Sequence, residues 1–343
     1  MTAVKGKLFE YFVQRLLIGH GFLPVKEEQP LVYRGTAGLM VQGAGQPHNA
    51  DVLLRPLFQT PFYYPTRLLV ECKCYDSPIG LPIVRNALGL REDINHFEIV
   101  TDEMLKNRQH PRRQGPKYDT RRRYLYQVAV ASLDGFKDTA VAFAQAHRIP
   151  LLSFAQSGLF TAIRADIEAV EQQAKNDAAF TERVLSCLRR WIRDSDRDVD
   201  PNSIHDETLQ SFLEELENLR RKTSIGLLDD GTLLFLVRLE PNVAYLSGRS
   251  YDDGCSIHWS NDDRRYWVLR DREKCYGFEL PEEIYRHWET NTSRKYRDAL
   301  RIKDDYFSNI TLFHGRDAEG EPVQFLELSE SFMEEAGRNL PDV

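Results

Sequence analysis

Several features that mark other protein classes are missing from this sequence. No apolar run approaches the roughly 18 residues that span a membrane, and the first residues lack the charged-then-apolar pattern of a secretion signal. No Gly-x-x-x-x-Gly-Lys-Ser/Thr phosphate loop occurs, which argues against ATP hydrolysis by that route. We therefore expect a cytoplasmic protein that has no membrane partner.

Cysteine is also scarce. The chain has 5 cysteines, which form neither a CxxC pair nor a histidine-spaced zinc pattern. Their odd number fits reduced thiols. They are Cys72, Cys74, Cys187, Cys255 and Cys275.

What is present is a charged, globular composition with an uneven charge distribution. The 343 residues are 42% hydrophobic and 28% charged, which suits two domains of ordinary size. The formal net charge is -7, yet residues 1–150 carry 20 basic and 14 acidic residues, against 25 and 38 in the remainder. This split predicts that the two halves face different partners.

A pair of predicted strands holds the most informative residues. In Arg67-Leu-Leu-Val-Glu-Cys-Lys-Cys-Tyr75, strand alternation places Glu71 and Lys73 on one face and the cysteines on the other. Asp51 begins a second apolar run that ends at residue 55, and three prolines lie between the runs. A hairpin of this kind brings Asp51 toward Glu71. An acid-x-lysine pair on a solvated strand edge is the alternative interpretation.

These residue types suit a hard cation. The carboxylates of Asp51 and Glu71, with the backbone carbonyl of Cys72, are predicted ligands for Mg²⁺, with Mn²⁺ able to substitute. Lys73 is predicted to orient or deprotonate an attacking water and to offset phosphate charge. Partial burial near a metal would lower its pKa.

Upstream, the segment from Lys5 to Phe22 has apolar residues at helical spacing and a glycine at its end, which predicts an amphipathic helix. Glu10 lies beside the apolar stripe, where a carboxylate needs a partner. We therefore add Glu10 to the candidate catalytic residues.

In order and spacing, these motifs resemble the PD-(D/E)xK nuclease superfamily, in particular its Mrr-like restriction endonuclease branch. The motifs are Gly6-x-x-Phe9-Glu10, Gly21-Phe22, Asp51 and Glu71-x-Lys73. The resemblance covers about residues 1–155. It implies a mixed central sheet flanked by helices, with Asp51 and Glu71 as metal ligands, Lys73 as the water-positioning lysine and Glu10 as a supporting carboxylate.

The sequence after the motif continues the resemblance. It predicts a helix over 79–90, a strand over 124–132, a helix over 134–144 and a strand over 149–153. Two departures stand out. The aspartate follows His48-Asn49-Ala50 rather than a Gly-x or Pro context, and Glu71 stands where Mrr-like members often have glutamine, which restores the superfamily motif.

The positive excess of the first half is concentrated in residues 106–123, which hold eight basic residues and one acidic residue. Next to a candidate nuclease strand, such a segment predicts contact with a DNA backbone; a solvated loop is the alternative. We also count His48 among the candidate nucleic-acid contacts, although a plain loop role is open for it. The predicted basic contacts are Lys106, Arg108, Arg112, Arg113, Lys117, Arg121, Arg122 and Arg123.

The remaining sequence predicts a helical connector and linker over 156–204 and an α+β domain over 205–343. Residues 154–193 have helical periodicity, and residues 194–203 are acidic and polar. Helix 207–221, hairpins over 226–238 and 310–328, strands over 264–269 and 275–280, and a helix over 281–290 are then expected. No residue of this part points to a chemistry.

Together, the sequence predicts an α/β protein with an N-terminal Mg²⁺-dependent DNA endonuclease, which by resemblance serves restriction or anti-phage defence. RNA remains open as a substrate. Cleavage of both strands favours a homodimer or a higher homo-oligomer. One alternative is a nuclease-fold DNA-binding module without turnover, and another is a sensor subunit whose C-terminal domain binds a partner protein. The acidic second half also suggests that it occupies the basic nuclease cleft, an autoinhibition hypothesis.

Overall fold

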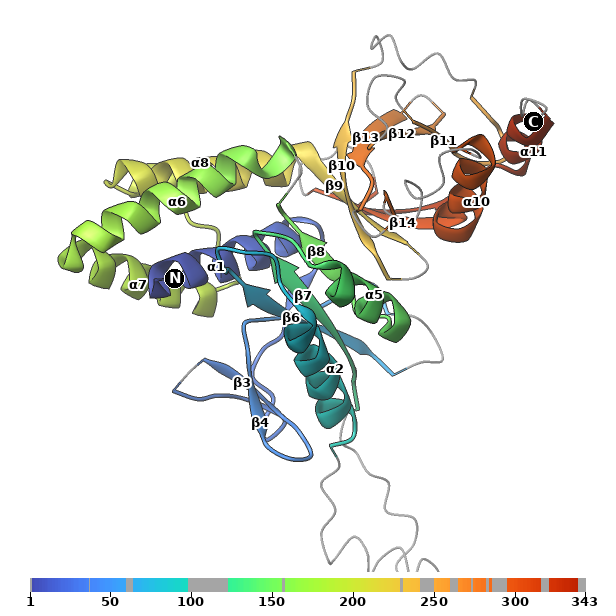
Figure 1. The fold of residues 1–343 in the computed structure, drawn as a ribbon. Coiled ribbons are helices and arrows are strands. Elements are labelled where there is room, and N and C mark those ends of the chain that lie inside the picture. The colour runs from blue at the N-terminus through green and yellow to red at the C-terminus, as the bar shows by residue number, and fades with distance from the viewer. Residues whose placement is uncertain are drawn as a thin grey trace, which may run out of the picture.

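The computed structural model describes residues 2–36, 38–59, 64–97, 123–155, 158–228, 231–240, 250–259, 265–272, 274–281, 284–285, 295–315 and 321–338. It is a mixed α/β structure, and Figure 1 shows its elements. Among the described residues, no helix combines the length and the apolar composition that a bilayer crossing requires.

A five-stranded mixed sheet forms the centre of the N-terminal part. Its order is β1 (Leu23–Pro24), β5 (Val52–Arg55), β6 (Thr66–Lys73), β7 (Leu125–Ser132) and β8 (Leu151–Ser153). The first three strands pair antiparallel, whereas β6, β7 and β8 pair parallel. Strands β5 to β8 confirm the strands predicted from apolar and alternating runs.

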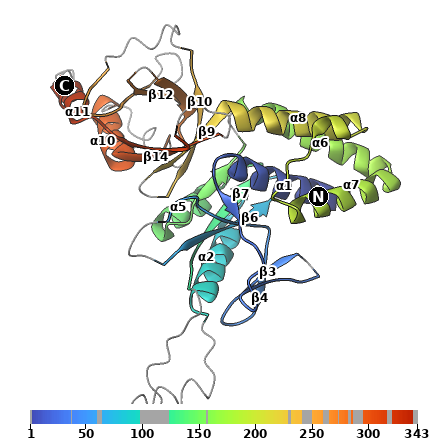
Figure 2. The ribbon, with the colours of Figure 1, turned by 180° about the vertical axis from the view of Figure 1, so that it is seen from behind.

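Helices cover both faces of this sheet (Figures 1 and 2). On one face α1 (Ala3–Gly19) packs on the sheet, and α6 (Thr161–Asn176), α7 (Ala178–Arg193) and α8 (Glu207–Lys222) pack in turn against α1. The other face carries α2 (Leu81–Asn95) and α5 (Asp138–His147). Strand alternation explains the two cores. Val70 and Cys74 belong to the core on the α1 side, whereas Leu69 belongs to the core on the α2 side.

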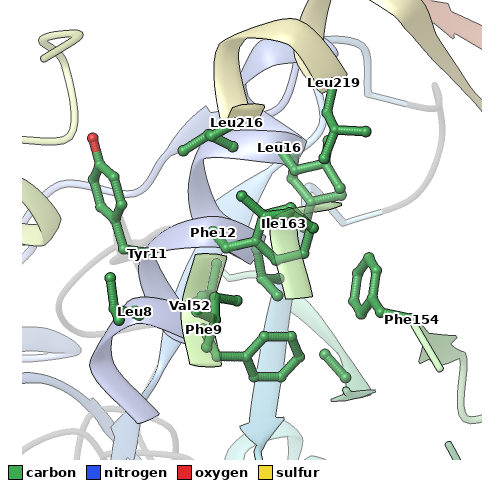
Figure 3. Packing of buried hydrophobic residues seen from close by; sticks show 14 of the residues in the cluster. Leu8, Phe9, Tyr11, Phe12, Leu16, Val52, Phe154, Ile163, Leu216 and Leu219 are labelled. Atoms are coloured by element: carbon green, nitrogen blue, oxygen red, sulfur yellow. The ribbon is translucent and has the colours of Figure 1, made fainter. Parts of the chain in front are cut away.

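Helix α1 is the centre of the first core. Its N-terminus is capped by the Thr2 hydroxyl, which accepts a hydrogen bond from the Lys5 backbone N–H. After the helix ends, Gly21 adopts a φ of +90°, a conformation that favours glycine. Figure 3 shows Phe9 and Phe12 packed with residues from other elements. The helix predicted here is confirmed, but it is buried on more than the one face expected of an amphipathic helix, because 13 of its 17 residues are buried between the sheet and the helices that pack on it.

A small antiparallel sheet lies beside the central one and was not predicted. It consists of β2 (Val32–Arg34), β3 (Leu39–Gln42) and β4 (Pro47–Ala50). Because β4 and β5 flank Asp51, this small sheet runs directly into the candidate site.

The C-terminal part is built on a seven-stranded antiparallel sheet. Its strands are β11 (Ser256–Trp259), β12 (Tyr266–Asp271), β13 (Lys274–Glu279), β10 (Leu233–Arg238), β9 (Thr223–Leu228), β14 (Asn309–His314) and β15 (Val323–Glu327) in spatial order. The sheet curls until its two edges meet, because Cys255 beside β11 pairs with Leu328 after β15. Helices α10 (Lys295–Phe307) and α11 (Glu330–Arg338) accompany it. Most of the helix predicted over 281–290 lies outside the described residues.

Short 3₁₀ turns η1 (Gly158–Phe160) and η2 (Pro201–Ser203) precede α6 and α8. The connector helices and the first domain share one continuous core, in which Phe154 contacts Phe12 and, from the C-terminal sheet, Phe235. The domain boundaries predicted near residues 155 and 204 therefore stay predictions. They do not coincide with a gap in the packing of the described residues.

Candidate active site

The site lies where β5 and β6 pair. Asp51 immediately precedes β5, whose Val52 is paired with Val70 of β6, so the Asp51 side chain faces the end of β6. The backbone N–H of Cys72 donates a hydrogen bond to Asp51 Oδ2 at 3.0 Å. The predicted hairpin therefore does bring Asp51 to the Glu71-x-Lys73 motif, and a backbone contact fixes its orientation.

Lys73 bridges the two carboxylates. Its Nζ lies 2.7 Å from Glu71 Oε2 and 3.6 Å from Asp51 Oδ2. The side chains are largely buried, with exposed fractions of 25% for Lys73, 20% for Glu71 and 14% for Asp51. The alternative of a solvated edge pair is therefore disfavoured, because opposite charges this close and this buried interact far more strongly than surface pairs.

Glu10 approaches the same centre from α1. Its side chain is only 13% exposed, and Lys7, one helical turn earlier, donates a hydrogen bond to Glu10 Oε2. Burial and then the negative charge of Asp51 raise the pKa of Glu10 to about 7, although Lys7 and Lys73 act in the opposite direction. The helix thus places a third carboxylate in the electrostatic field of the first two.

The same charges set the protonation of the strand residues. Burial raises the pKa of Glu71, and the Asp51 carboxylate adds to that effect. Burial lowers the pKa of Lys73, but the carboxylates of Asp51 and Glu71 outweigh it, so the pKa is raised. The lowered pKa expected from sequence concerned a lysine beside a bound metal and stays a prediction, whereas the protein's own charges alone keep Lys73 a charged donor at neutral pH.

This donor set fits a small hard cation. Carboxylates that repel one another gain from a positive charge between them, as the raised pKa values of Glu10 and Glu71 indicate. Within the described ranges, no three His, Cys, Asp or Glu side chains are close enough to form a complete metal cage. Mg²⁺ requires no such cage, because it keeps several waters and uses one or two carboxylates.

Cys72 is a candidate ligand only through its backbone. Its side chain packs against the core on the α1 side, and burial raises the pKa of the Cys72 thiol well above its ordinary value. A thiol that holds its proton is a poor metal ligand. Cys74 is buried in the same core, as alternation along the strand predicts.

Two clefts open on either side of this centre. One, of about 360 Å³, is lined by Glu10 and Asp51 together with residues of α7. The other, of about 510 Å³, is lined by Glu71 and Lys73 together with residues of α2. Asn49 of β4 lines both clefts. The carboxylates and the lysine are therefore accessible from two directions.

His48 lies in the second cleft and has a partner. Its Nε2 is 2.6 Å from Asp93 Oδ2 near the end of α2, and the backbone N–H of Gly45 donates to Asp93 Oδ1 at 2.7 Å. The Asp93 carboxylate therefore ties the β3–β4 turn to α2 and holds the imidazole of His48 through its Nε2. A contact between His48 and substrate stays a prediction.

Of the predicted basic contacts in residues 106–123, only Arg123 lies in the described part of the chain. Arg123, just before β7, is exposed. The other predicted contacts, Lys106, Arg108, Arg112, Arg113, Lys117, Arg121 and Arg122, lie outside the described residues.

Sequence reasoning missed the cleft residues that come from distant elements. Arg189 and Arg193 of α7 and Arg34 of β2 line the cleft that contains Asp51, and Arg85 of α2 lines the other. The spacing of four between Arg189 and Arg193 predicts a shared helix face. Nothing in the sequence indicates what that face meets.

Comparison with known proteins adds little. No model of a known protein family matches the chain, and no curated protein matches it. A crystal structure described as a protein of unknown function, AF1548, is similar over 55% of this chain and 98% of that chain, at 14% identity and a TM-score of 0.28. A similarity of this size supports no functional argument.

Proposed function

We propose that this chain is a metal-dependent endonuclease that hydrolyses DNA phosphodiester bonds, with a restriction-endonuclease-like N-terminal domain. The observation that carries the proposal is the convergence of Asp51, Glu71 and Lys73 across β5 and β6, within 3.6 Å and largely buried. The mixed sheet with helices on both faces is consistent with that fold. Restriction or anti-phage defence is the setting that the motif resemblance favours.

Each residue has a part that follows from its charge and position. Asp51 and Glu71, with the Cys72 carbonyl, would hold Mg²⁺. When bound, this cation neutralises phosphate charge and makes a coordinated water more acidic. Lys73 carries a positive charge at neutral pH, so it is suited to hold the nucleophilic water or a phosphate oxygen by a charge-assisted hydrogen bond.

Glu10 is the residue best suited to accept a proton. Burial is the larger cause of its raised pKa, with the charge of Asp51 second, and a raised pKa makes its carboxylate a stronger base than that of an ordinary glutamate. With Lys73 protonated, we assign the proton transfer to Glu10 and the charge stabilisation to Lys73. One such site cuts one strand, so cleavage of a duplex would use two copies of the chain.

The proposal is tested with supercoiled plasmid, purified protein and Mg²⁺, with and without EDTA. We expect metal-dependent nicking or linearisation that is lost in Asp51→Asn and Lys73→Ala. Lys137→Ala is the matched control, because Lys137 is an exposed lysine just before α5. Cleavage that survives in both site variants would refute the assigned residues. Salt-sensitive DNA binding without any cleavage would instead support a nuclease-fold binding subunit.

A further inference from the structure

The connector helix α7 is held firmly against the catalytic helix α1. The rings of Tyr11 and Trp191 lie 5.5 Å apart, and Trp191 is almost fully buried. Just beyond α7, the Ser195 carbonyl accepts a hydrogen bond from Arg15 Nη1 at 2.8 Å. Arg15 is itself 2% exposed. These contacts fix the last turn of α7 beside the part of α1 that carries Glu10.

This packing turns one face of α7 into a wall of the cleft that holds Asp51. The charged residues that line this cleft are four basic ones, Lys7, Arg34, Arg189 and Arg193, and two acidic ones, Glu10 and Asp51. Arg189 and Arg193 are four residues apart, so they lie on the same face, about 6 Å apart along the helix axis. Both are exposed.

These arginines are not neutralised by strong ion pairs. Arg193 Nε is 3.0 Å from Asp194, its neighbour in sequence, and both side chains are about half exposed. Within the part of the chain that the structure describes, Arg189 has no ion-pair or hydrogen-bond partner for its side chain. Exposed pairs are worth at most about 1 kcal/mol, so they are readily exchanged for phosphate.

We infer that α7 is part of the substrate-binding surface, with Arg189 and Arg193 contacting backbone phosphates of the DNA strand beside the scissile bond. Arg34 of β2 lies on the same cleft, where its Nε donates a hydrogen bond to Glu27 at 2.9 Å. Both of these side chains are more than 40% exposed, so this pair too can be exchanged for phosphate. This inference rests on the proposed function. A solvated helix face does not explain why these cations share one cleft with the two carboxylates, whereas a polyanion that reaches those carboxylates through this cleft passes the arginines.

Contacts of this kind have a measurable signature. Arginine–phosphate contacts supply affinity without sequence preference, and each phosphate neutralised contributes about 0.9 to the slope of log affinity against log salt. Removal of two such contacts should therefore weaken binding to all sequences alike and lower that slope by about 2.

The test is fluorescence anisotropy with the full chain and a labelled DNA duplex in EDTA, across a salt series. The variant is Arg189→Glu with Arg193→Glu. Its matched control is Arg183→Glu with Arg190→Glu, which makes the same charge change at exposed positions of α7 that do not line the cleft. We expect at least about a tenfold loss of affinity and a lower salt slope for the first pair only.

An equal loss of affinity in both double variants would overturn the inference, because only overall charge would then matter. The inference also fails if neither double variant loses affinity, or if the unaltered chain does not bind DNA. The result is separable from the proposed function. If the protein binds through Arg189 and Arg193 but never cuts, the binding surface stands and the nuclease proposal fails. If it cuts while the first pair binds normally, the nuclease proposal stands and the inference fails.

Discussion

Glu10 offers the most direct test of the electrostatics of the site, and it needs no substrate. Its pKa is raised from 4.5 to about 7, mainly by burial and then by Asp51. A change of that size corresponds to about 3 kcal/mol between the protonated and ionised forms. Because the side chain is only 13% exposed, solvent screens little of this energy.

The sign of the effect follows from linkage. The folded-state pKa lies above the unfolded-state value, so the stabilising contribution of the protonated carboxyl is complete below pH 4.5 and is lost as the pH rises through about 7. Glu10→Gln keeps the shape and cannot ionise. We therefore expect the free energy of unfolding of the variant to rise relative to that of the unaltered chain between pH 5 and pH 8. The rise should reach at most about 3 kcal/mol, and loss of the ionic contact with Lys7 reduces it.

The assay is urea unfolding at pH 5, 6, 7 and 8, with Glu182→Gln as the control because Glu182 is an exposed carboxylate on α7. A free-energy difference between Glu10→Gln and the unaltered chain that is the same at every pH would refute the reasoning. Addition of Mg²⁺ at pH 8 should stabilise the unaltered chain more than at pH 5, because the cation offsets the same repulsion.

Three further predictions concern other parts of the fold. Phe154→Ala should lower the free energy of unfolding by about 3–5 kcal/mol, since Phe154 is fully buried, whereas Phe58→Ala, at a side chain 57% exposed, should change it by less than about 0.5 kcal/mol in urea titrations. Gly43→Ala should destabilise the chain in thermal melts, because the added Cβ would lie 2.0 Å from Asp93 Oδ2, whereas Gly89→Ala, where a Cβ meets nothing within 4 Å, should be neutral or stabilising. Lys303→Met should stabilise the chain, most strongly below pH 7. Burial lowers the pKa of Lys303 from 10.5 to about 7, so the free-energy cost of burying the charged ammonium is complete below pH 7. A lower melting temperature of the variant at pH 6 would contradict this.

Local patterns predicted the elements that hold the proposed catalytic residues. Alternation over residues 67–75 identified β6 and the faces of Glu71 and Cys74, and helical periodicity identified α1. The extent of burial did not follow from these patterns, because Leu69 and Val70 face two different cores and 13 of the 17 residues of α1 are buried. The meeting of Asp51 with Lys73 also followed, since the hairpin that joins them is local in sequence.

What the sequence concealed depends on packing between distant segments. The β2–β4 sheet consists of strands only three or four residues long, which leave a weak periodic signal. The raising of the Lys73 pKa by the protein's own charges was not predicted, because it depends on the balance between burial and two carboxylates, and that balance requires distances. Likewise, Arg189 lines the cleft because α7 packs on α1, through contacts such as that of Trp191 with Tyr11.

The shared core also changes how autoinhibition by the acidic half must be tested. A fragment that ends near residue 195 would seem the natural comparison, but it lacks α8, whose Leu213, Leu216 and Leu219 belong to the same core as Phe12 of α1. Its loss would uncover apolar surface around the helix that carries Glu10, so an inactive fragment would report unfolding rather than the absence of inhibition. The hypothesis therefore requires charge substitutions at exposed C-terminal carboxylates in the full chain. If the acidic half inhibits cleavage, such variants should cut DNA faster than the unaltered chain while their thermal stability is unchanged.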